Sequence, residues 1–256
     1  MYNSIYNTLI IGKKVIYLPT CHSTNDIAAE LVQKELAEEG TIVITDNQVN
    51  GRGQRGSEWH TEPSKNLTFS IILKPNFVPV NEQFLLSQVV ALAIYKYLSA
   101  YTNEVKIKWP NDIYVSSKKI CGTLIENSIQ GMSISNSIVG IGININQVHF
   151  RNSRTTSLAL VSGREFSLNA ELSKFAQFFD SAYLRLRSMQ NKDQIQSEYL
   201  SNVYGFNETV TFRHQNEIVK GMVTGVSSAG KLRVKLADQK GIYEFGLKEI
   251  EWIWED

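Results

Sequence analysis

The glycine- and arginine-rich stretch at residues 51–59, GRGQRGSEW, contains the residue types best suited to hold an anion. Arg52 and Arg55 carry permanently charged guanidinium groups whose N–H donors match the oxygens of a carboxylate or a phosphate. The glycines between them allow the backbone to approach a ligand closely. The same composition is common in flexible connections and nucleic-acid contacts, and the pattern is neither a Walker loop nor a dinucleotide fingerprint. Taken alone, the stretch predicts an anion-binding loop without naming the anion.

A second group of charged residues follows at the ends of two expected strands. Lys108 ends one strand, Asn111 and Asp112 form the turn after it, and Lys119 and Gly122 lie near the start of the next strand. Asn and Asp favour turns for purely local reasons, and neighbouring lysines are usually solvated. A cation and a carboxylate beside an anion loop are nevertheless typical of an active site, and a glycine inside a strand indicates a close backbone approach.

Small polar side chains provide a third candidate group. Ser23, Thr24 and Asn25 stand where a helix is expected to begin, and these residue types favour a helix N-cap on their own account. They also form a compact set of hydrogen-bond donors and acceptors suited to a neutral polar ligand. Gln48 precedes the glycine loop and can reach the same cavity, although a surface glutamine is the commoner outcome.

The strand expected at 137–146 alternates small and β-branched residues, so that Gly140 and Gly142 fall on one face and leave it without side chains. This bare face is a candidate binding floor. Trp59 either stacks on a ligand or anchors the returning chain, and packing is the simpler prediction.

The elements that position these groups follow from the hydrophobic periodicity. Pro19 is expected to close the first strand, and Gly40 to cap a first helix that runs through Leu36. Further helices are expected at 82–102, 169–188 and 194–203. Strands are expected at 14–18, 41–45, 67–73, 105–109, 113–115, 118–126 and 137–146. After residue 205 the periodicity changes to short alternating strands, which predicts a small barrel of about five strands.

Composition limits the class of protein. The chain has 256 residues, 43% hydrophobic residues and a formal net charge of +1, which argues against a protein that mainly coats nucleic acid or anionic lipid. Its two cysteines are too few for a disulfide framework, so a reducing, cytoplasmic location is expected. Cys121 lacks the surroundings of a cysteine nucleophile and is expected to be a buried small residue. Neither a signal peptide nor a membrane span is recognisable.

Several segments together resemble biotin protein ligases. They are GRGQRG at 51–56, KWPNDI at 108–113, KICG at 119–122 with Glu126 following, GIGIN at 140–144, Ser23-Thr24-Asn25, and Thr156-Ser157-Leu158. Their order and spacing cover nearly the whole chain. The resemblance implies an enzyme that joins biotin and ATP to biotinyl-5′-adenylate, releases pyrophosphate and transfers biotin to one lysine of a carrier protein.

The resemblance also implies roles for individual residues. Arg52 and Lys119 would offset the repulsion between two anions, and Asp112 would orient the incoming lysine. The biotin pocket would be formed by Ser23, Thr24, Asn25, Gln48, Arg52, Gly53, Gln54, Lys119, Gly122 and Gly142. The nucleotide and adenylate would be bound by Arg52, Arg55, Trp59, Lys108, Asn111, Asp112, Lys119 and Asn144.

One position departs from the family. Many members carry arginine where this chain has Gln54, so one charge over the adenylate is missing. Either the reactive adenylate is held less firmly, or Arg55 replaces the missing charge.

Two other functions are less consistent with these segments. A lipoate or octanoate transferase shares the general fold, but the complete KWPND run and the C-terminal barrel speak against it. A biotin-sensing repressor would need a helix-turn-helix domain, and only residues 1–22 precede Ser23, so DNA binding is not expected.

The expected fold is α+β, with a mixed, mainly antiparallel sheet flanked by helices, as in class II synthetases, and a small C-terminal SH3-like β-barrel. The catalytic domain is expected at residues 1–204 and the C-terminal domain at 205–256. The expected substrates are biotin and ATP with Mg²⁺, whose ligands the sequence does not assign. The expected partner is a biotin carboxyl carrier domain of a carboxylase, without DNA or membrane, and a homodimer is left open.

Overall fold

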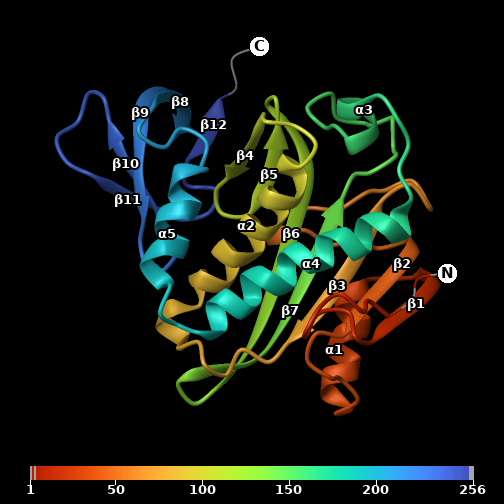
Figure 1. Ribbon diagram of the computed structural model, residues 1–256. Coiled ribbons are helices and arrows are strands. Elements are labelled where there is room, and N and C mark those ends of the chain that lie inside the picture. The colour runs from red at the N-terminus through yellow and green to blue at the C-terminus, as the bar shows by residue number, and fades with distance from the viewer. Residues whose placement is uncertain (1, 3, 254–256) are drawn as a thin grey trace.

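A seven-stranded mixed sheet forms the larger part of the computed structural model, which describes residues 2 and 4–253 (Figure 1). Its strands follow the order β1-β2-β3-β7-β6-β5-β4, in which β1 and β2 are parallel and all other neighbours antiparallel. The strands are β1 (Val15–Cys21), β2 (Ile42–Gln48), β3 (Leu67–Leu73), β4 (Val105–Lys108), β5 (Asp112–Val115), β6 (Lys118–Gln130) and β7 (Ser133–Ile143).

Helices cover both faces of this sheet, because the central strands carry apolar side chains on both sides. The long helices α2 (Phe84–Ser99) and α4 (Leu168–Arg187) pack together over one face, where Phe69 meets Phe175 edge to face. Helix α1 (Thr24–Gln33) lies on the opposite face, over Val43 and Ile72. The remaining helical segments are α3 (Leu158–Ser162), α5 (Lys192–Ser201), and the 3₁₀ turns η1 (Gln54–Gly56) and η2 (Val80–Glu82). Among the described helices, none is both long and apolar enough to cross a membrane.

The C-terminal segment forms a separate five-stranded antiparallel sheet in the order β11-β10-β9-β8-β12. Its strands are β8 (Thr209–His214), β9 (Glu217–Val226), β10 (Leu232–Leu236), β11 (Tyr243–Phe245) and β12 (Glu251–Ile253). Alternate residues of β10 point inward, as expected for a half-buried strand. The predicted α+β fold with a small SH3-like domain is confirmed.

The two sheets meet at the turn between β4 and β5. The Trp109 indole nitrogen donates to the carbonyl oxygen of Gly230 at 2.9 Å, and the Trp109 ring lies 6.4 Å from the ring of Trp252 on β12. The small domain therefore contacts the edge of the large sheet at the segment in which charged residues were expected to gather.

Several element boundaries differ from the sequence-based expectation: β6 and β7 extend further toward their shared turn, and two other differences have a local cause. Strand β1 continues past Pro19 to Cys21, which is tolerated because β1 is an edge strand and the missing N–H costs no sheet hydrogen bond. Helix α1 ends at Gln33 rather than near Leu36, since Glu35 adopts a positive φ of 56°. Gly40 is not a helix cap: its N–H donates to the carbonyl of Ile72.

Candidate functional site

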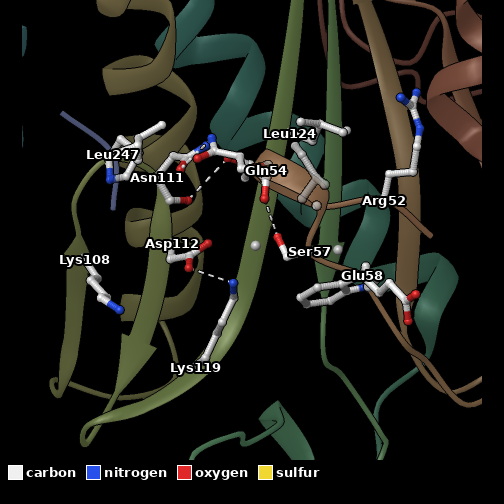
Figure 2. Close-up of a pocket in the computed structure, with 18 of the residues that line it drawn as sticks. Arg52, Gln54, Ser57, Glu58, Lys108, Asn111, Asp112, Lys119, Leu124 and Leu247 are labelled. Carbon is white, nitrogen blue, oxygen red and sulfur yellow. Dashed lines mark hydrogen bonds and ion pairs between the residues drawn. The ribbon is translucent and has the colours of Figure 1, made fainter. Parts of the chain in front are cut away.

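A cavity of about 470 Å³ crosses the sheet and ends against the small domain. This volume lies in the range usual for small-molecule sites. Of the residues expected to bind substrate, the following line it: Ser23, Thr24, Asn25, Gln48, Arg52, Gly53, Gln54, Trp59, Lys108, Asn111, Asp112, Lys119, Gly122 and Gly142. Figure 2 shows the part of this cavity between Lys108 and Arg52. Segments far apart in sequence therefore share one cavity.

The polar cluster at the start of α1 forms the first end of the cavity. Gln48 Oε1 accepts a hydrogen bond from the Thr24 N–H at 2.8 Å, and the Ser70 hydroxyl donates to Asn25 Oδ1 at 2.6 Å. The N-cap residue is Ser23, but its side chain makes no cap hydrogen bond, so Gln48 satisfies the helix terminus instead. Ser23, Thr24 and Asn25 are buried. The expected helix start at Ser23 is confirmed, but the expected side-chain cap bond is absent, and the side chains of Thr24 and Asn25 bond to Gln48, Ser70 and Glu126 instead.

A compact ion pair occupies the middle of the cavity. Lys119 Nζ lies 2.7 Å from Asp112 Oδ2, and both side chains remain partly exposed to the cavity. Gln54 Nε2 donates to Asn111 Oδ1 at 3.2 Å, while Asn111 Nδ2 donates to the Thr123 carbonyl at 3.0 Å. Figure 2 shows these side chains grouped together, and the loop residue Gln54 reaches the turn of the β4–β5 hairpin.

Arg52 lines the same cavity, but its guanidinium points away from Lys119 and Asp112 (Figure 2). It pairs with Asp26 and with Glu126, whose Oε2 lies 3.4 Å away. Glu126 Oε2 also accepts a hydrogen bond from Asn25 Nδ2 at 2.6 Å. The carboxylate of Glu126 thus connects the glycine loop with the polar cluster.

The glycine floor is covered by the indole of Trp59. A Cβ at Gly142 would overlap this ring, and a Cβ at Gly122 would lie 3.1 Å from both the ring and Lys119 Nζ. Gly140 serves a different purpose, because a Cβ there would overlap the side-chain amide of Asn25. The Trp59 indole nitrogen is buried and has no hydrogen-bond partner among the described residues. Trp59 therefore lies where a flat ligand was expected, and that ligand would have to share or displace its ring.

One expected site residue, Asn144, is not part of the cavity lining. Asn144 is buried, and its amide nitrogen donates to the carbonyl of Thr156 at 3.0 Å. Its backbone N–H donates to the Ile120 carbonyl, so it lies beside the strand that carries Lys119. The side chain of Arg55 lies outside the described part of the structure.

Cys121 is completely buried, and burial raises the pKa of its thiol. The expected packing function of Cys121 is confirmed, because a nucleophilic cysteine needs an accessible thiol with a lowered pKa.

The small domain forms one wall of the cavity, and no sequence motif predicted this. Residues Leu247, Lys248, Ile250, Glu251 and Trp252 line it. Their contribution depends on how the two domains dock, which local periodicity does not encode. Glu126 was noted only as part of a motif, and nothing in its sequence context indicated that it would bind Arg52.

Lys108 lies between the two domains at the second end of the cavity. Burial lowers the pKa of its ammonium group, whereas the carboxylates of Asp112 and Glu251 act in the opposite direction. The site therefore has a polar end near α1, where the Glu126 carboxylate contacts Asn25, and an end beside the small domain that contains Lys108, with Lys119 between them.

Comparisons with known proteins agree with this arrangement. Residues 17–144 match the biotin/lipoate A/B protein ligase family, and residues 205–253 match the biotin protein ligase C-terminal domain. The bifunctional ligase/repressor BirA of Bacillus spizizenii is 30% identical over 250 residues, covering 95% of this chain and 75% of the relative. A biotin–[acetyl-CoA-carboxylase] ligase of Paracoccus denitrificans is 36% identical over 106 residues, covering 40% of this chain and 43% of that protein.

A solved structure shares the architecture over nearly the whole length. The biotin protein ligase of Aquifex aeolicus in complex with biotin and ATP superposes with a TM-score of 0.74 and 25% identity, covering 93% of this chain and 98% of that one. These matches identify the chain as a ligase. The chain belongs to the biotin protein ligase family.

Proposed function

We propose that this enzyme activates biotin with ATP and transfers it to a specific lysine of a biotin carboxyl carrier domain of a carboxylase. In the first step a biotin carboxylate oxygen attacks the α-phosphorus of ATP, and pyrophosphate leaves. In the second step the lysine amine attacks the acyl carbon of biotinyl-5′-adenylate, and AMP leaves with the bonding electrons. The match to a biotin–[acetyl-CoA-carboxylase] ligase supports this acceptor class.

The position of Lys119 is the observation that carries the proposal. Its ammonium lies in the middle of the cavity, between the neutral polar cluster and the end beside the small domain. The attack joins two anionic groups, so the reaction needs a cation at the point where they meet. A donor at this point can bind the carboxylate first and the developing phosphate charge afterwards.

Biotin is proposed to occupy the end near α1. Its ureido ring presents N–H donors and a carbonyl acceptor, which match the hydroxyl and amide groups of Ser23, Thr24, Asn25 and Gln48. Arg52, Gly53 and Gln54 belong to the loop that would close over biotin. The biotin ring would lie along the backbone at Gly122 and Gly142 after the Trp59 ring has moved away from these glycines.

ATP is proposed to occupy the other end with Mg²⁺ as its complex, since Mg²⁺ in nucleotide sites is bound largely through phosphate oxygens. Lys108 and Asn111 line this end. Arg55 and Trp59 are proposed to contact the adenylate after loop closure, and Asn144 to fix the strand of Lys119 through its backbone hydrogen bond to Ile120.

Asp112 is proposed to orient the lysine amine of the carrier. Its carboxylate pairs with Lys119 in this structure and can exchange that partner for the incoming amine once Lys119 has bound the adenylate. We expect Asp112→Ala to form adenylate but to transfer biotin slowly. Transfer by Asp112→Ala at the rate of the unaltered enzyme would refute this role.

We propose further that residues 1–204 act as the catalytic domain and 205–256 as a C-terminal domain, and that the protein works in the cytoplasm without binding DNA. A gel-shift assay with biotin-operon DNA tests the last point. Whether the enzyme acts as a homodimer is open to sedimentation measurements with and without biotin and ATP.

The decisive experiment uses the whole chain with labelled biotin, ATP, Mg²⁺ and a carrier domain, followed by detection of covalent label. We expect label on the carrier only when ATP is present. A carrier whose target lysine is replaced by arginine is the matched control, and octanoate in place of biotin separates this activity from that of a lipoate-type transferase. Absence of label on the intact carrier would overturn the proposal.

A further inference from the structure

The ammonium of Lys108 lies between two aromatic rings that belong to different domains. Its Nζ is 5.3 Å from the ring centre of Tyr114 on β5 and 5.9 Å from the ring centre of Trp252 on β12. Both distances fall within the range at which a cation is attracted to the face of an aromatic ring. The large sheet supplies one side of this contact, and the small domain supplies the other.

Charged groups from three strands act on Lys108. Asp112 on β5 and Glu251 on β12 favour the protonated ammonium, whereas Lys119 on β6 and above all burial disfavour it, and the balance lowers its pKa. Such an ammonium interacts more strongly with an anion than a solvated one, because less water screens it. The two rings and the two carboxylates compensate part of its lost hydration.

Trp252 is fixed by packing rather than by a hydrogen bond. Its ring lies 5.3 Å from that of Phe212 within the small domain and 6.4 Å from that of Trp109, and only 7% of the residue is exposed. Among the described residues, its indole nitrogen has no hydrogen-bond partner. The contacts that fix Trp252 are therefore those of its ring.

The order of the strands indicates which ligand Lys108 meets. Gln48 ends β2 near one side of the sheet, Lys119 lies on β6, and Lys108 ends β4 at the opposite edge. In the proposed function, which this inference refines, the polar cluster binds biotin and Lys119 lies at the reacting groups. Lys108 then lies on the far side, where the nucleotide phosphates continue.

We propose that Trp252 is a positioning residue that, together with Tyr114, holds the Lys108 ammonium at the interdomain end of the cavity, where it binds phosphate oxygens of ATP. The small domain thereby completes the nucleotide site through one ring. The proposal accounts for a domain contact that is centred on Trp109 and Trp252, beside the charged end of the cavity.

Steady-state kinetics of adenylate formation test the proposal. Trp252→Leu removes the aromatic face and is expected to raise the KM for ATP about tenfold, with the KM for biotin unchanged and kcat within about twofold. Trp252→Phe retains a face and should recover most of the loss. Phe245→Leu is the matched control, because Phe245 is a buried aromatic residue of the small domain that does not line the cavity.

A double-mutant cycle separates positioning from packing. Tyr114→Leu changes the other ring without altering the small domain and should also raise the KM for ATP. In a Lys108→Gln background, Trp252→Leu should have no further effect on this KM. A full additional loss in that background, or a KM for ATP that neither Tyr114→Leu nor Trp252→Leu changes, would overturn the proposal.

A readout independent of catalysis distinguishes this inference from the proposed function. Reductive ¹³C-methylation labels the lysines for NMR titration, and the Lys108 signal is the one missing from Lys108→Arg. We expect its pKa to lie below that of exposed lysines and to shift in Trp252→Leu, because the ring contact and the exclusion of water are both lost. An inactive enzyme that still shows this shift would contradict only the proposed function, whereas an unchanged pKa in an active enzyme would contradict only the inference.

Discussion

The reaction proposed for this ligase depends on the few charged side chains in the middle of its cavity. Lys119 and Asp112 are 2.7 Å apart, so each neutralises the other before substrate arrives. This pairing keeps an exposed cation and a carboxylate in fixed positions without leaving either uncompensated. Binding of the biotin carboxylate at Lys119 would free Asp112 to orient the lysine amine of the carrier. Lys119 would thus act in adenylate formation and Asp112 in biotin transfer.

Lys119 should be needed for adenylate formation far more than for binding. We expect Lys119→Gln to lower kcat by roughly 10²–10³-fold, the range typical for loss of one donor to a developing charge. Pyrophosphate release measures this step. Lys118→Gln is the matched control, because Lys118 is the neighbouring lysine, is exposed and does not line the cavity. Equal rates for the two variants would exclude a special role of Lys119.

Gln54 should affect retention of the adenylate. Its amide donates to Asn111 at 3.2 Å and places no charge over the cavity. Gln54→Arg would add a permanent cation beside the adenylate phosphate, so we expect slower release of free biotinyl-5′-adenylate in the absence of carrier. Chromatography of the released adenylate provides the measurement. Unchanged release would mean that Arg55 or another group already holds the intermediate.

Glu126 links the glycine loop at 51–59 to the polar cluster at the start of α1. It pairs with Arg52 and accepts a hydrogen bond from Asn25, and only the contact with Arg52 depends on its charge. We expect Glu126→Gln to retain the Asn25 hydrogen bond and to weaken the hold on Arg52. The glycine loop should then be cut faster by trypsin in the ligand-free enzyme, while biotin affinity stays within about threefold. Identical cleavage rates would contradict the connection.

At the scale of elements, the strands of the large sheet bring side chains that are distant in sequence together. Glycines in these strands determine how closely those side chains approach the backbone of the sheet. Gly140 on β7 leaves room for the amide of Asn25 on α1, and Gly142 leaves room for the ring of Trp59. The prediction that Gly140 and Gly142 leave one face of this strand without side chains of its own is therefore confirmed. Side chains from other segments, Asn25 and Trp59, pack against this face, so the glycines alone do not identify what binds there.

Gly140→Ala should weaken biotin binding selectively. The added methyl group would overlap the Asn25 amide and push it from its contacts with Ser70 and Glu126. We expect a loss of about tenfold or more in biotin affinity, since a buried polar group would lose its partners. Isothermal titration with biotin measures the effect.

The control for this substitution is Gly225→Ala, at a strand glycine whose Cβ would meet only Arg233 at 3.8 Å. It should leave biotin affinity and thermal stability nearly unchanged. If Gly140→Ala bound biotin as well as Gly225→Ala, Asn25 would have no part in the biotin site.

Helices and strands were predictable because their signal is local. The periodicity placed α2, α4 and most strands within a few residues of their ends. It failed at Pro19 and Leu36, where an edge strand tolerates proline and a positive φ at Glu35 ends the helix early. The direction of the Arg52 side chain was not predictable either, since Asp26 and Glu126 approach it only in the folded chain.

At the scale of the whole molecule, the cavity is complete only where the two sheets meet. Glu251 and Trp252 of the small domain line it beside Lys108, although Lys108 lies far from both in sequence. Motifs identify the catalytic sheet because their residues act within one segment. A cavity wall shared between domains has no such sequence motif. The C-terminal sequence therefore predicted a barrel but not that this barrel lines the cavity.

Removal of the small domain should therefore impair nucleotide use before it impairs biotin binding. A chain ending at Phe206 loses Trp252 and the Gly230 carbonyl that accepts the Trp109 indole N–H, which exposes Lys108 to water. Its polar cluster near α1 remains intact, because those residues make no contact with the barrel through the hydrogen bonds described for them. We expect biotin affinity to fall less than about threefold and adenylate formation by more than about a hundredfold.

The truncated chain also exposes apolar surface at the former interface, so its folding has to be checked independently. A full-length chain with Gly230→Trp provides this check, since the bulky side chain would overlap the ring of Phe84 and press the domains apart without deleting either. Biotin titration and circular dichroism establish that the catalytic sheet is intact in both variants. If both then formed adenylate and modified the carrier at full rate, the small domain would have no catalytic function, and the charged end of the cavity would need another explanation.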